Sequence, residues 1–128
     1  MSKELNMDFA RRDAIIGGKE QGIYDIYHFQ GLTLEKLELL FKENFIDGDD
    51  AQDSAPTAQE ILEFMRANPR FTCHGYAVTI ERSDYRVSIE GVSLEEKVTE
   101  ADRENFTNLF RHADEFSCSS SGCYCWFD

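Results

Sequence analysis

Two alternating runs in the middle of the chain predict a β-hairpin, and this feature limits the possible folds most strongly. Over residues 71–81, large apolar side chains alternate with polar neighbours, and the same alternation returns over 85–89. The Arg-Ser-Asp sequence at 82–84 has the composition of a tight turn. Successive side chains point to opposite faces of a strand, so such alternation indicates strands with one face buried. We therefore expect residues 71–91 to form an antiparallel hairpin.

Capping boxes predict one helix before the hairpin and one after it. Thr57 precedes Glu60 by three residues, and Thr99 precedes Asp102 by the same spacing. In a capping box, each of the two side chains accepts a hydrogen bond from the other residue's free backbone N–H. Apolar residues follow both signals at helical spacing. One predicted helix therefore precedes the hairpin along the chain, and another follows it.

Two more helices are expected in the first third of the chain. Residues 7–16 fit a helix that ends at Gly17, since glycine readily adopts the left-handed conformation that ends helices. Thr33 can cap a helix that runs to about Phe45, with leucine and phenylalanine along one face. Together with the capping boxes, these signals predict three to four helices.

Further strands are expected on both sides of the hairpin. The run at 23–29 is β-branched and aromatic, and the chain closes with a short strand at 123–127 that can fold back on 116–118. Mixed strands and helices of this kind predict an α+β fold with a small antiparallel or mixed sheet of about four strands. The helices should pack mainly on one face. The length of 128 residues fits a single domain over residues 1–128.

The net charge of the chain indicates which classes of partner it can bind. It has 25 acidic residues and 13 lysines and arginines, for a net charge of −12. A negative surface repels phosphate backbones and anionic membranes, so neither direct nucleic-acid binding nor membrane contact is expected. It favours a basic protein partner, although acidity can also serve solubility alone. The first residues lack the apolar stretch of a signal peptide, so we expect a cytoplasmic protein, monomeric or a small homo-oligomer.

An acidic loop is the first candidate surface for such a partner. It contains Asp47, Asp49, Asp50 and Asp53. A calcium loop of the EF-hand type that began at Asp47 would need glycine at position 52 and glutamate at position 58. The chain has Gln52 and Ala58 there, so a solvated acidic loop is the preferred interpretation. Its concentrated negative charge suits contact with a basic protein.

Two aromatic residues near the end of the chain form the second candidate surface. In the terminal strand, Tyr124 and Trp126 alternate with Cys123, Cys125 and Phe127. If the cysteines and phenylalanine face the core, the two aromatic residues share the opposite face. Aromatic residues exposed in that way are typical interface anchors. The alternative is that both faces are covered and the tryptophan belongs to the core.

The four cysteines allow three interpretations. Cys118, Cys123 and Cys125, with Cys73 or His74 as a fourth ligand, could hold a structural zinc ion. They could instead be buried, reduced thiols, or Cys118 and Cys123 could form a disulfide across the serine-rich turn. The spacing does not match the usual zinc motifs, and no signature links a cysteine to a histidine base. We expect buried thiols, no metal and no cofactor.

Several stretches resemble a pattern found in small bacterial proteins of unknown function. They are residues 31–46, 57–65, 74–78, 84–91, 111–116 and 125–128. In size and acidity the chain is also similar to bacterial immunity proteins, which bind and neutralise toxins. The resemblance implies a partner-binding role, and it assigns a function to no individual residue.

The sequence therefore leaves three alternative functions to be tested. The first is a non-catalytic acidic protein that captures a basic protein through the acidic loop and the Tyr124–Trp126 pair, as an immunity protein would. The second is a small enzyme with a polar site near His74, Arg82, Asp84 and Arg86. The third is a nucleic-acid mimic that blocks a DNA-binding protein, which would require carboxylates in a regular stripe.

Overall fold

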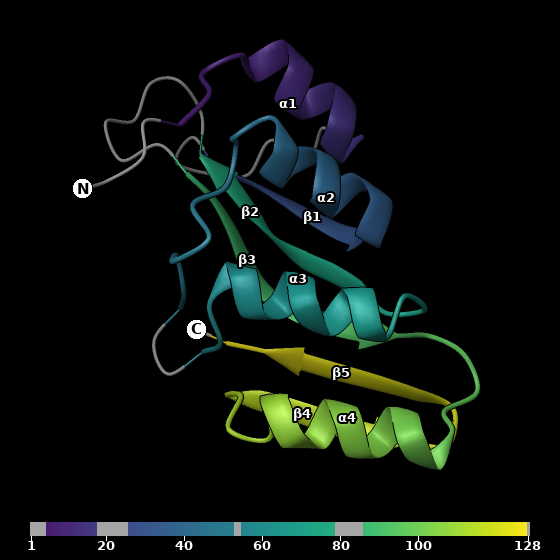
Figure 1. Ribbon diagram of the computed structural model, residues 1–128. Coiled ribbons are helices and arrows are strands. Elements are labelled where there is room, and N and C mark those ends of the chain that lie inside the picture. The colour runs from purple at the N-terminus through teal and green to yellow at the C-terminus, as the bar shows by residue number, and fades with distance from the viewer. Residues whose placement is uncertain (1–4, 18–25, 53–54, 79–85, 128) are drawn as a thin grey trace.

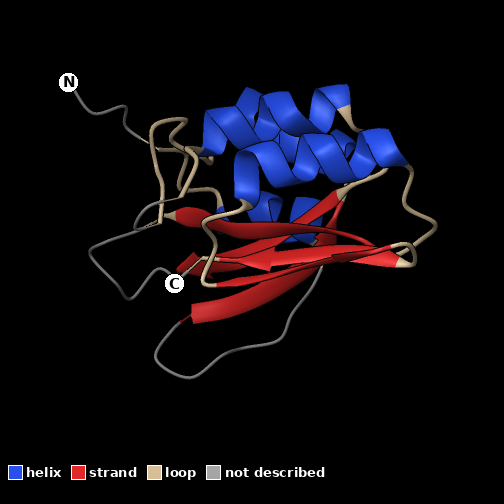
Figure 2. Cartoon of the chain, turned by 90° about the horizontal axis from the view of Figure 1, so that it is seen from below, coloured by secondary structure: helices blue, strands red, loops and turns tan. Residues whose placement is uncertain are grey.

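A computed structural model of the chain describes residues 5–17, 26–52, 55–78 and 86–127. Within these ranges it contains an antiparallel five-stranded sheet in the order β1-β2-β3-β5-β4, with four helices over one face (Figures 1 and 2). The helices are α1 (Phe9–Ile16), α2 (Leu34–Lys42), α3 (Ala58–Ala67) and α4 (Glu100–Phe110). The strands are β1 (Ile26–Leu32), β2 (Thr72–Val78), β3 (Val87–Leu94), β4 (Glu115–Ser119) and β5 (Gly122–Trp126). The α+β prediction is confirmed, and the sheet is one strand larger than expected.

Both predicted capping boxes are present. The Thr57 hydroxyl accepts from the Glu60 N–H at 3.1 Å, and the Glu60 carboxylate accepts from the Thr57 N–H at 3.0 Å. At α4 the corresponding distances between Thr99 and Asp102 are 3.1 and 2.9 Å. These bonds satisfy backbone donors that the first helical turn leaves without an intrahelical partner. Both helices therefore begin where local sequence alone places their caps.

The sequence predicts the end of α1 correctly but not the end of α2. Gly17 ends α1 in the left-handed conformation, with φ of +76°, as predicted. The second helix begins after Thr33 as expected, but it ends at Lys42 and not near Phe45. Asn44 has φ of +65°, which no α-helix can contain. The turn sends Phe45 into the core, where it is fully buried.

The hairpin of β2 and β3 is confirmed, and its turn at 82–84 lies outside the described residues. So do residues 23–25 of the first predicted strand, which otherwise matches β1. The return segment predicted at 116–118 is a full strand, β4, and it accounts for the fifth member of the sheet. The terminal hairpin therefore consists of β4 and β5.

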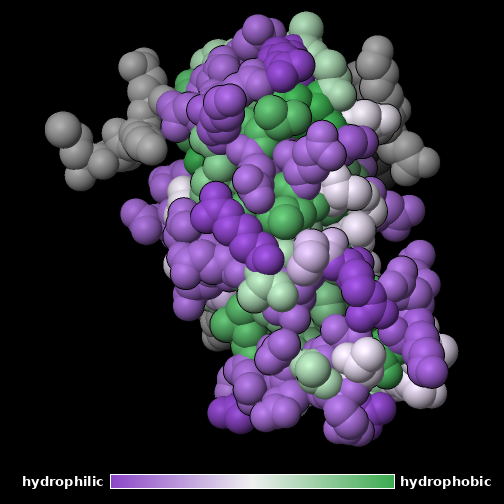
Figure 3. All heavy atoms as spheres, turned by 45° about the vertical axis from the view of Figure 1, so that its right-hand side comes forward, coloured by the Kyte–Doolittle hydropathy of each residue, from purple (hydrophilic) through white to green (hydrophobic). Residues whose placement is uncertain are grey.

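The core lies between the helices and the sheet and is rich in phenylalanine. Phe64 from α3 packs edge-on against Phe71 and Phe110, with ring centroids 5.0 and 4.9 Å apart. Phe106 stacks on Phe71 at 5.8 Å and is fully buried. The face of the molecule shown in Figure 3 is mainly hydrophilic, with smaller hydrophobic areas visible among the hydrophilic side chains. These apolar contacts, which cross from helices to strands, fix the helical layer on one face of the sheet.

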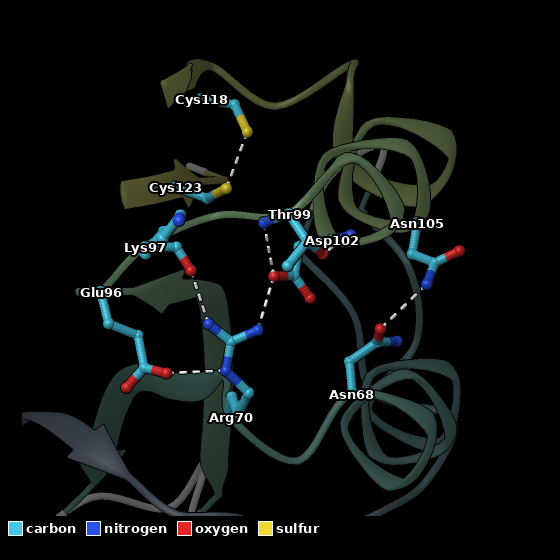
Figure 4. Close-up of polar contacts among 9 residues, drawn as sticks. All are labelled: Asn68, Arg70, Glu96, Lys97, Thr99, Asp102, Asn105, Cys118 and Cys123. Atoms are coloured by element: carbon cyan, nitrogen blue, oxygen red, sulfur yellow. Dashed lines mark hydrogen bonds and ion pairs between the residues drawn. The ribbon is translucent and has the colours of Figure 1, made fainter. Parts of the chain in front are cut away.

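Arg70 connects the start of β2 to the loop before α4 (Figure 4). Its guanidinium donates to the Glu96 carboxylate, to the Asp102 carboxylate and to the Lys97 carbonyl, each at 2.6 Å. Hydrogen bonds from the Thr99 backbone and from Arg70 hold the pKa of Asp102 below its ordinary value, against the opposing effect of burial. Arg70 therefore ties the loop after β3 to the same carboxylate that caps α4.

None of the helices in the described ranges combines the length and the hydrophobicity that a membrane span requires. The longest of them, α4, has 11 residues.

Candidate functional site

The described helices all lie over one face of the sheet (Figure 2), and the strand registers determine which side chains lie on the other face. Residues that pair directly across antiparallel strands point to the same face. The pairs on this face are His28 with Tyr76, Tyr76 with Ser88, Ser93 with Tyr124, and Glu115 with Trp126. We call it the open face of the sheet.

A groove of about 490 Å³ runs along the open face. The lining side chains that bear on function are His28, His74, Glu90, Glu95, Tyr124 and Trp126. Tyr124 is 39% exposed and Trp126 is half-buried, whereas Cys123, Cys125 and Phe127 are buried on the opposite side of the strand. The predicted alternation of β5 is therefore confirmed, and it brings both aromatic residues into one concave surface. We call this surface the sheet-face groove.

His74 is held firmly in the floor of the groove. Its ring stacks on Tyr124, with centroids 5.1 Å apart and planes 10° from parallel. Its Nε2 atom lies 2.9 Å from the Cys125 carbonyl oxygen, and burial lowers the pKa of the imidazole against the opposing effect of this contact. A neutral His74 therefore donates through Nε2–H to the carbonyl. A Cβ at position 91 would lie 2.7 Å from Nε2, so Gly91 provides the space that the ring needs.

Glu90 lies on the open face, where strand alternation places it two residues after Ser88. Gly75 pairs with Ile89 and His74 pairs with Gly91, so Glu90 is also the extra residue of a β-bulge. A bulge shifts the alternation of the residues that follow it while the strand continues. The Glu90 carboxylate is 3.9 Å from Nδ1 of His28, and its side chain is only 13% exposed.

The groove is negatively charged. Its described lining residues include Glu90 and Glu95 but no lysine or arginine. Glu115, which pairs with Trp126, adds a third carboxylate on the same face. Burial raises the pKa of Tyr124, and the charges of Glu115, Cys125 and Glu90 add to that increase in this order. Carboxylates therefore surround the exposed aromatic rings.

This arrangement suits the binding of a cation attached to a larger molecule. A lysine ammonium or an arginine guanidinium is attracted to the face of an aromatic ring and to nearby carboxylates. The site offers both, from Tyr124 and Trp126 on β5 and from Glu90 on β3. His74 covers one face of the Tyr124 ring, and its contact with the Cys125 carbonyl fixes the floor of the groove.

The acidic loop is more ordered and less exposed than the sequence indicated. Asp47 accepts from the Asp49 N–H at 3.0 Å, which closes a tight local turn. Asp50 accepts from the Ser88 hydroxyl at 2.9 Å. Asp47 and Asp50 are half-buried, and Asp49 alone among these three is exposed. Asp53 lies outside the described residues. Of the described aspartates in the loop, Asp49 is therefore the most exposed to solvent, and Asp50 is bonded to the sheet.

The same loop reaches the open face beside the groove. Gln52 donates to the Ser88 hydroxyl at 2.5 Å and lies 3.5 Å from the Tyr76 hydroxyl. Tyr76 in turn makes an edge contact with His28, which lines the groove. The two surfaces that the sequence indicated separately, the acidic loop and the Tyr124–Trp126 pair, are thus linked through one face of the sheet.

The residues proposed for an enzyme site are only partly described. His74 lies in the sheet-face groove. Arg86 instead donates to the Tyr76 hydroxyl at 3.1 and 2.9 Å and lies over its ring at 5.5 Å. Arg82 and Asp84 lie outside the described residues. The structure therefore brings no second member of this set into contact with His74 among the residues it describes.

The four cysteines lie on three strands, β2, β4 and β5. Within the described ranges, no group of three or more cysteine, histidine or acidic side chains could hold a metal ion. Cys73 and Cys125 are fully buried, and Cys118 lies against Cys123 with their Sγ atoms 2.7 Å apart. Three of the four thiols are therefore buried as expected, and Cys118 is half-buried.

Sequence reasoning missed three acidic members of this surface. Glu90 lies in an alternating strand pattern, two residues after Ser88, and this alternation places both side chains on the open face. Glu95 follows β3 and Glu115 begins β4, and neither belongs to a motif. One signal could have indicated Glu115. If the terminal strand folds back on 116–118, Trp126 lies opposite the residue just before that segment, which is Glu115.

Comparison of the chain with protein-family models, with curated protein sequences and with solved structures found no match.

Proposed function

We propose that this chain is a non-catalytic binding protein that captures a basic protein, in the manner of an immunity protein that neutralises a toxin. The sheet-face groove is its contact surface, and Asp49 of the acidic loop extends that surface. The observation that carries the proposal is the pairing of Tyr124 and Trp126 with Glu90, Glu95 and Glu115 on one face of the sheet.

The physical case combines two contributions. The net charge of −12 attracts a basic partner over distance and accelerates its encounter. Aromatic residues in a partly desolvated centre contribute most of the affinity at protein interfaces, and surrounding charged residues contribute specificity. Trp126 is the expected anchor because it is half-buried within the groove and retains accessible surface.

The first experiment identifies the partner and then measures the groove's contribution. The immobilised chain is used to capture proteins from lysate of the source organism, and the captured protein is purified for calorimetric titration. We expect a basic protein whose affinity falls by about 30-fold or more with Trp126→Ala, which is the scale of an interface hot spot. Glu104→Gln, an exposed acid on α4, is the matched control and should leave affinity unchanged.

The charge component has its own test. The double variant Glu90→Gln with Glu95→Gln should weaken binding most at low salt, since added salt screens the attraction of a negatively charged surface for a basic partner in the wild-type protein. Asp49→Lys should slow association without destabilising the fold, because this side chain is exposed. Capture of a protein that is not basic, or affinities that none of these groove variants changes, would contradict the proposal.

A small acid–base enzyme is the second candidate, and the observation that favours it is the concave position of His74. Active sites are concave, and this groove contains two histidines beside Glu90. The Nε2 atom of His74, however, is engaged with a backbone carbonyl. An enzyme would lose its activity with His74→Gln, whereas a binding protein would keep most of its affinity for the partner.

A further inference from the structure

The terminal hairpin brings two of the four cysteines together. Cys118 on β4 pairs directly with Cys123 on β5 across the turn at 119–122. Their Sγ atoms are 2.7 Å apart, and both thiols are free (Figure 4). Cys118 is half-buried and Cys123 is buried. One thiol of the pair therefore reaches solvent while the other is protected behind it.

We propose that Cys118 and Cys123 are a reversible modification site, a dithiol that peroxides oxidise to an intrachain disulfide. The inference rests on the geometry of the hairpin and is independent of the proposed partner-binding function. Directly opposed residues of an antiparallel pair have Cα atoms about 4.5–5.5 Å apart. Disulfides span Cα separations of about 4.4–6.8 Å, so the bond can form without a change of strand register.

The other two cysteines provide an internal contrast. Cys73 and Cys125 are fully buried in the core, and neither contacts a second sulfur among the described contacts. Burial raises the pKa of both thiols and also that of Cys123, so ionisation does not distinguish the two pairs. Access to the oxidant does, because Cys118 is half-buried whereas Cys73 and Cys125 are fully buried. We therefore expect oxidation to select the hairpin pair.

The reaction balances with hydrogen peroxide as the oxidant. The Cys118 thiolate attacks one peroxide oxygen, so an S–O bond forms, the O–O bond breaks, and the departing hydroxide takes a proton to become water. Cys123 then loses its proton and attacks the Cys118 sulfenic sulfur. The S–S bond forms, the S–O bond breaks, and the second hydroxide takes the Cys123 proton. Two thiols lose two electrons in total, and one peroxide becomes two waters.

The location of the pair determines what oxidation does to the fold. The two sulfurs lie on the helix side of the hairpin, beneath α4, which contacts both β4 and β5. Tyr124, the residue after Cys123, projects to the other side into the sheet-face groove. A disulfide would close the hairpin covalently and restrict the opening of β4, the edge strand of the sheet. It would leave the residues of the groove on their own face.

The test treats the full-length chain with hydrogen peroxide and measures free thiols and intact mass. We expect the free thiols to fall from four to two, with a mass decrease of about 2 Da that dithiothreitol reverses. Peptide mapping should find the bond between Cys118 and Cys123. Cys73 and Cys125 should remain alkylatable after unfolding. Hydrogen exchange of β4 amides should become slower in the oxidised protein.

A variant makes the result specific. Cys118→Ser removes the half-buried partner and should abolish the mass decrease, and a circular dichroism spectrum like that of the wild type checks that it folds. A wild-type protein that gains oxygen on Cys118 without losing two hydrogens would overturn the proposal. So would covalent dimers, or a disulfide that includes Cys73 or Cys125.

Discussion

On one side of β5, Tyr124 and Trp126 line a groove beside carboxylates, and on the other side Cys123 and Cys125 are buried under the helical layer. The same strand therefore belongs to two different environments. On the helix side, phenylalanines from α3, from α4 and from position 127, directly after β5, pack against one another. On the groove side, burial raises the pKa of Tyr124, and the charges of Glu115 and Glu90 add to that increase. Successive residues of one strand thus belong in turn to the core and to the open face.

The largest expected difference between the two faces is in stability. Phe106→Ala removes a fully buried ring that stacks on Phe71 and Phe116, at centroid distances of 5.8 and 5.1 Å. It should lower the free energy of unfolding by about 3–5 kcal/mol in urea denaturation. Trp126→Ala, on the groove side, should cost clearly less because its side chain is only half-buried. Equal losses of unfolding free energy in the two variants would contradict the difference in burial between the two faces.

A smaller loss should follow from filling the space beneath the groove. A methyl group at Gly91 would lie 2.0 Å from the Cys125 carbonyl oxygen and 2.7 Å from His74 Nε2. Gly91→Ala should therefore destabilise the protein by about 1–3 kcal/mol and displace the His74 ring, as seen in its NMR shifts. Gly48→Ala is the control, since its Cβ would meet only ordinary contacts of 3.5 Å or more. An unchanged free energy of unfolding in Gly91→Ala would show that the His74 ring does not lie against this position.

The charge network on the helix side predicts a pH-dependent stability. The pKa of Asp102 is below its ordinary value of 3.8, chiefly because the Thr99 backbone N–H donates to the carboxylate. Its contribution is therefore complete above pH 3.8 and is lost as the pH falls toward the lowered pKa. Asp102→Ala should cost about 1 kcal/mol at pH 7, and its difference from the wild type should shrink in acid.

The control for that variant is Glu104→Ala on the same helix. Glu104 is exposed, so this substitution should change stability by less than about 0.5 kcal/mol at any pH. A constant difference between Asp102→Ala and the wild type down to the lowest pH measured would contradict the role of the carboxylate. Urea unfolding at a series of pH values provides the comparison.

The smallest expected effect concerns His74 in the groove floor. Burial lowers its pKa below the ordinary value of 6.5, so an NMR titration should give a midpoint below 6.5. Protonation favours the unfolded state in this case, and His74 should therefore reduce stability slightly as the pH falls below 6.5. Tyr124→Ala removes the stacked ring and should move the midpoint toward 6.5. A wild-type midpoint at or above 6.5 would show that the ring is not buried as described.

Local signals in the sequence were enough to predict most elements of the fold. The capping boxes at Thr57 and Thr99, the glycine that ends α1 and the alternation in β5 each depend on a few neighbouring residues. The end of α2 was wrong, because the left-handed Asn44 has no strong local signal. The sequence also did not indicate that β4 would be a complete strand, since its side chains are mostly exposed and lack a clear apolar alternation.

The candidate site could be predicted only in part. Tyr124 and Trp126 were found because alternation along one strand is a local property. Their neighbours Glu90 and Glu115 come from two other strands, β3 and β4. The loop aspartates were correctly indicated as a cluster, but the bond between Asp50 and Ser88 joins residues 38 positions apart. Such contacts depend on strand order and register, which no short stretch specifies.

What the sequence determined by itself was the acidity of the chain, the starts of its helices and the two-sided character of its last strand. These follow from side-chain charge and from hydrogen bonds within a few residues. Only the tertiary structure decided that three strands would contribute carboxylates and aromatic rings to one groove, and that Cys118 would face Cys123. The physical reason is that pairing across strands brings together residues far apart in the chain, and burial of the core on one face determines which of them remain accessible on the other.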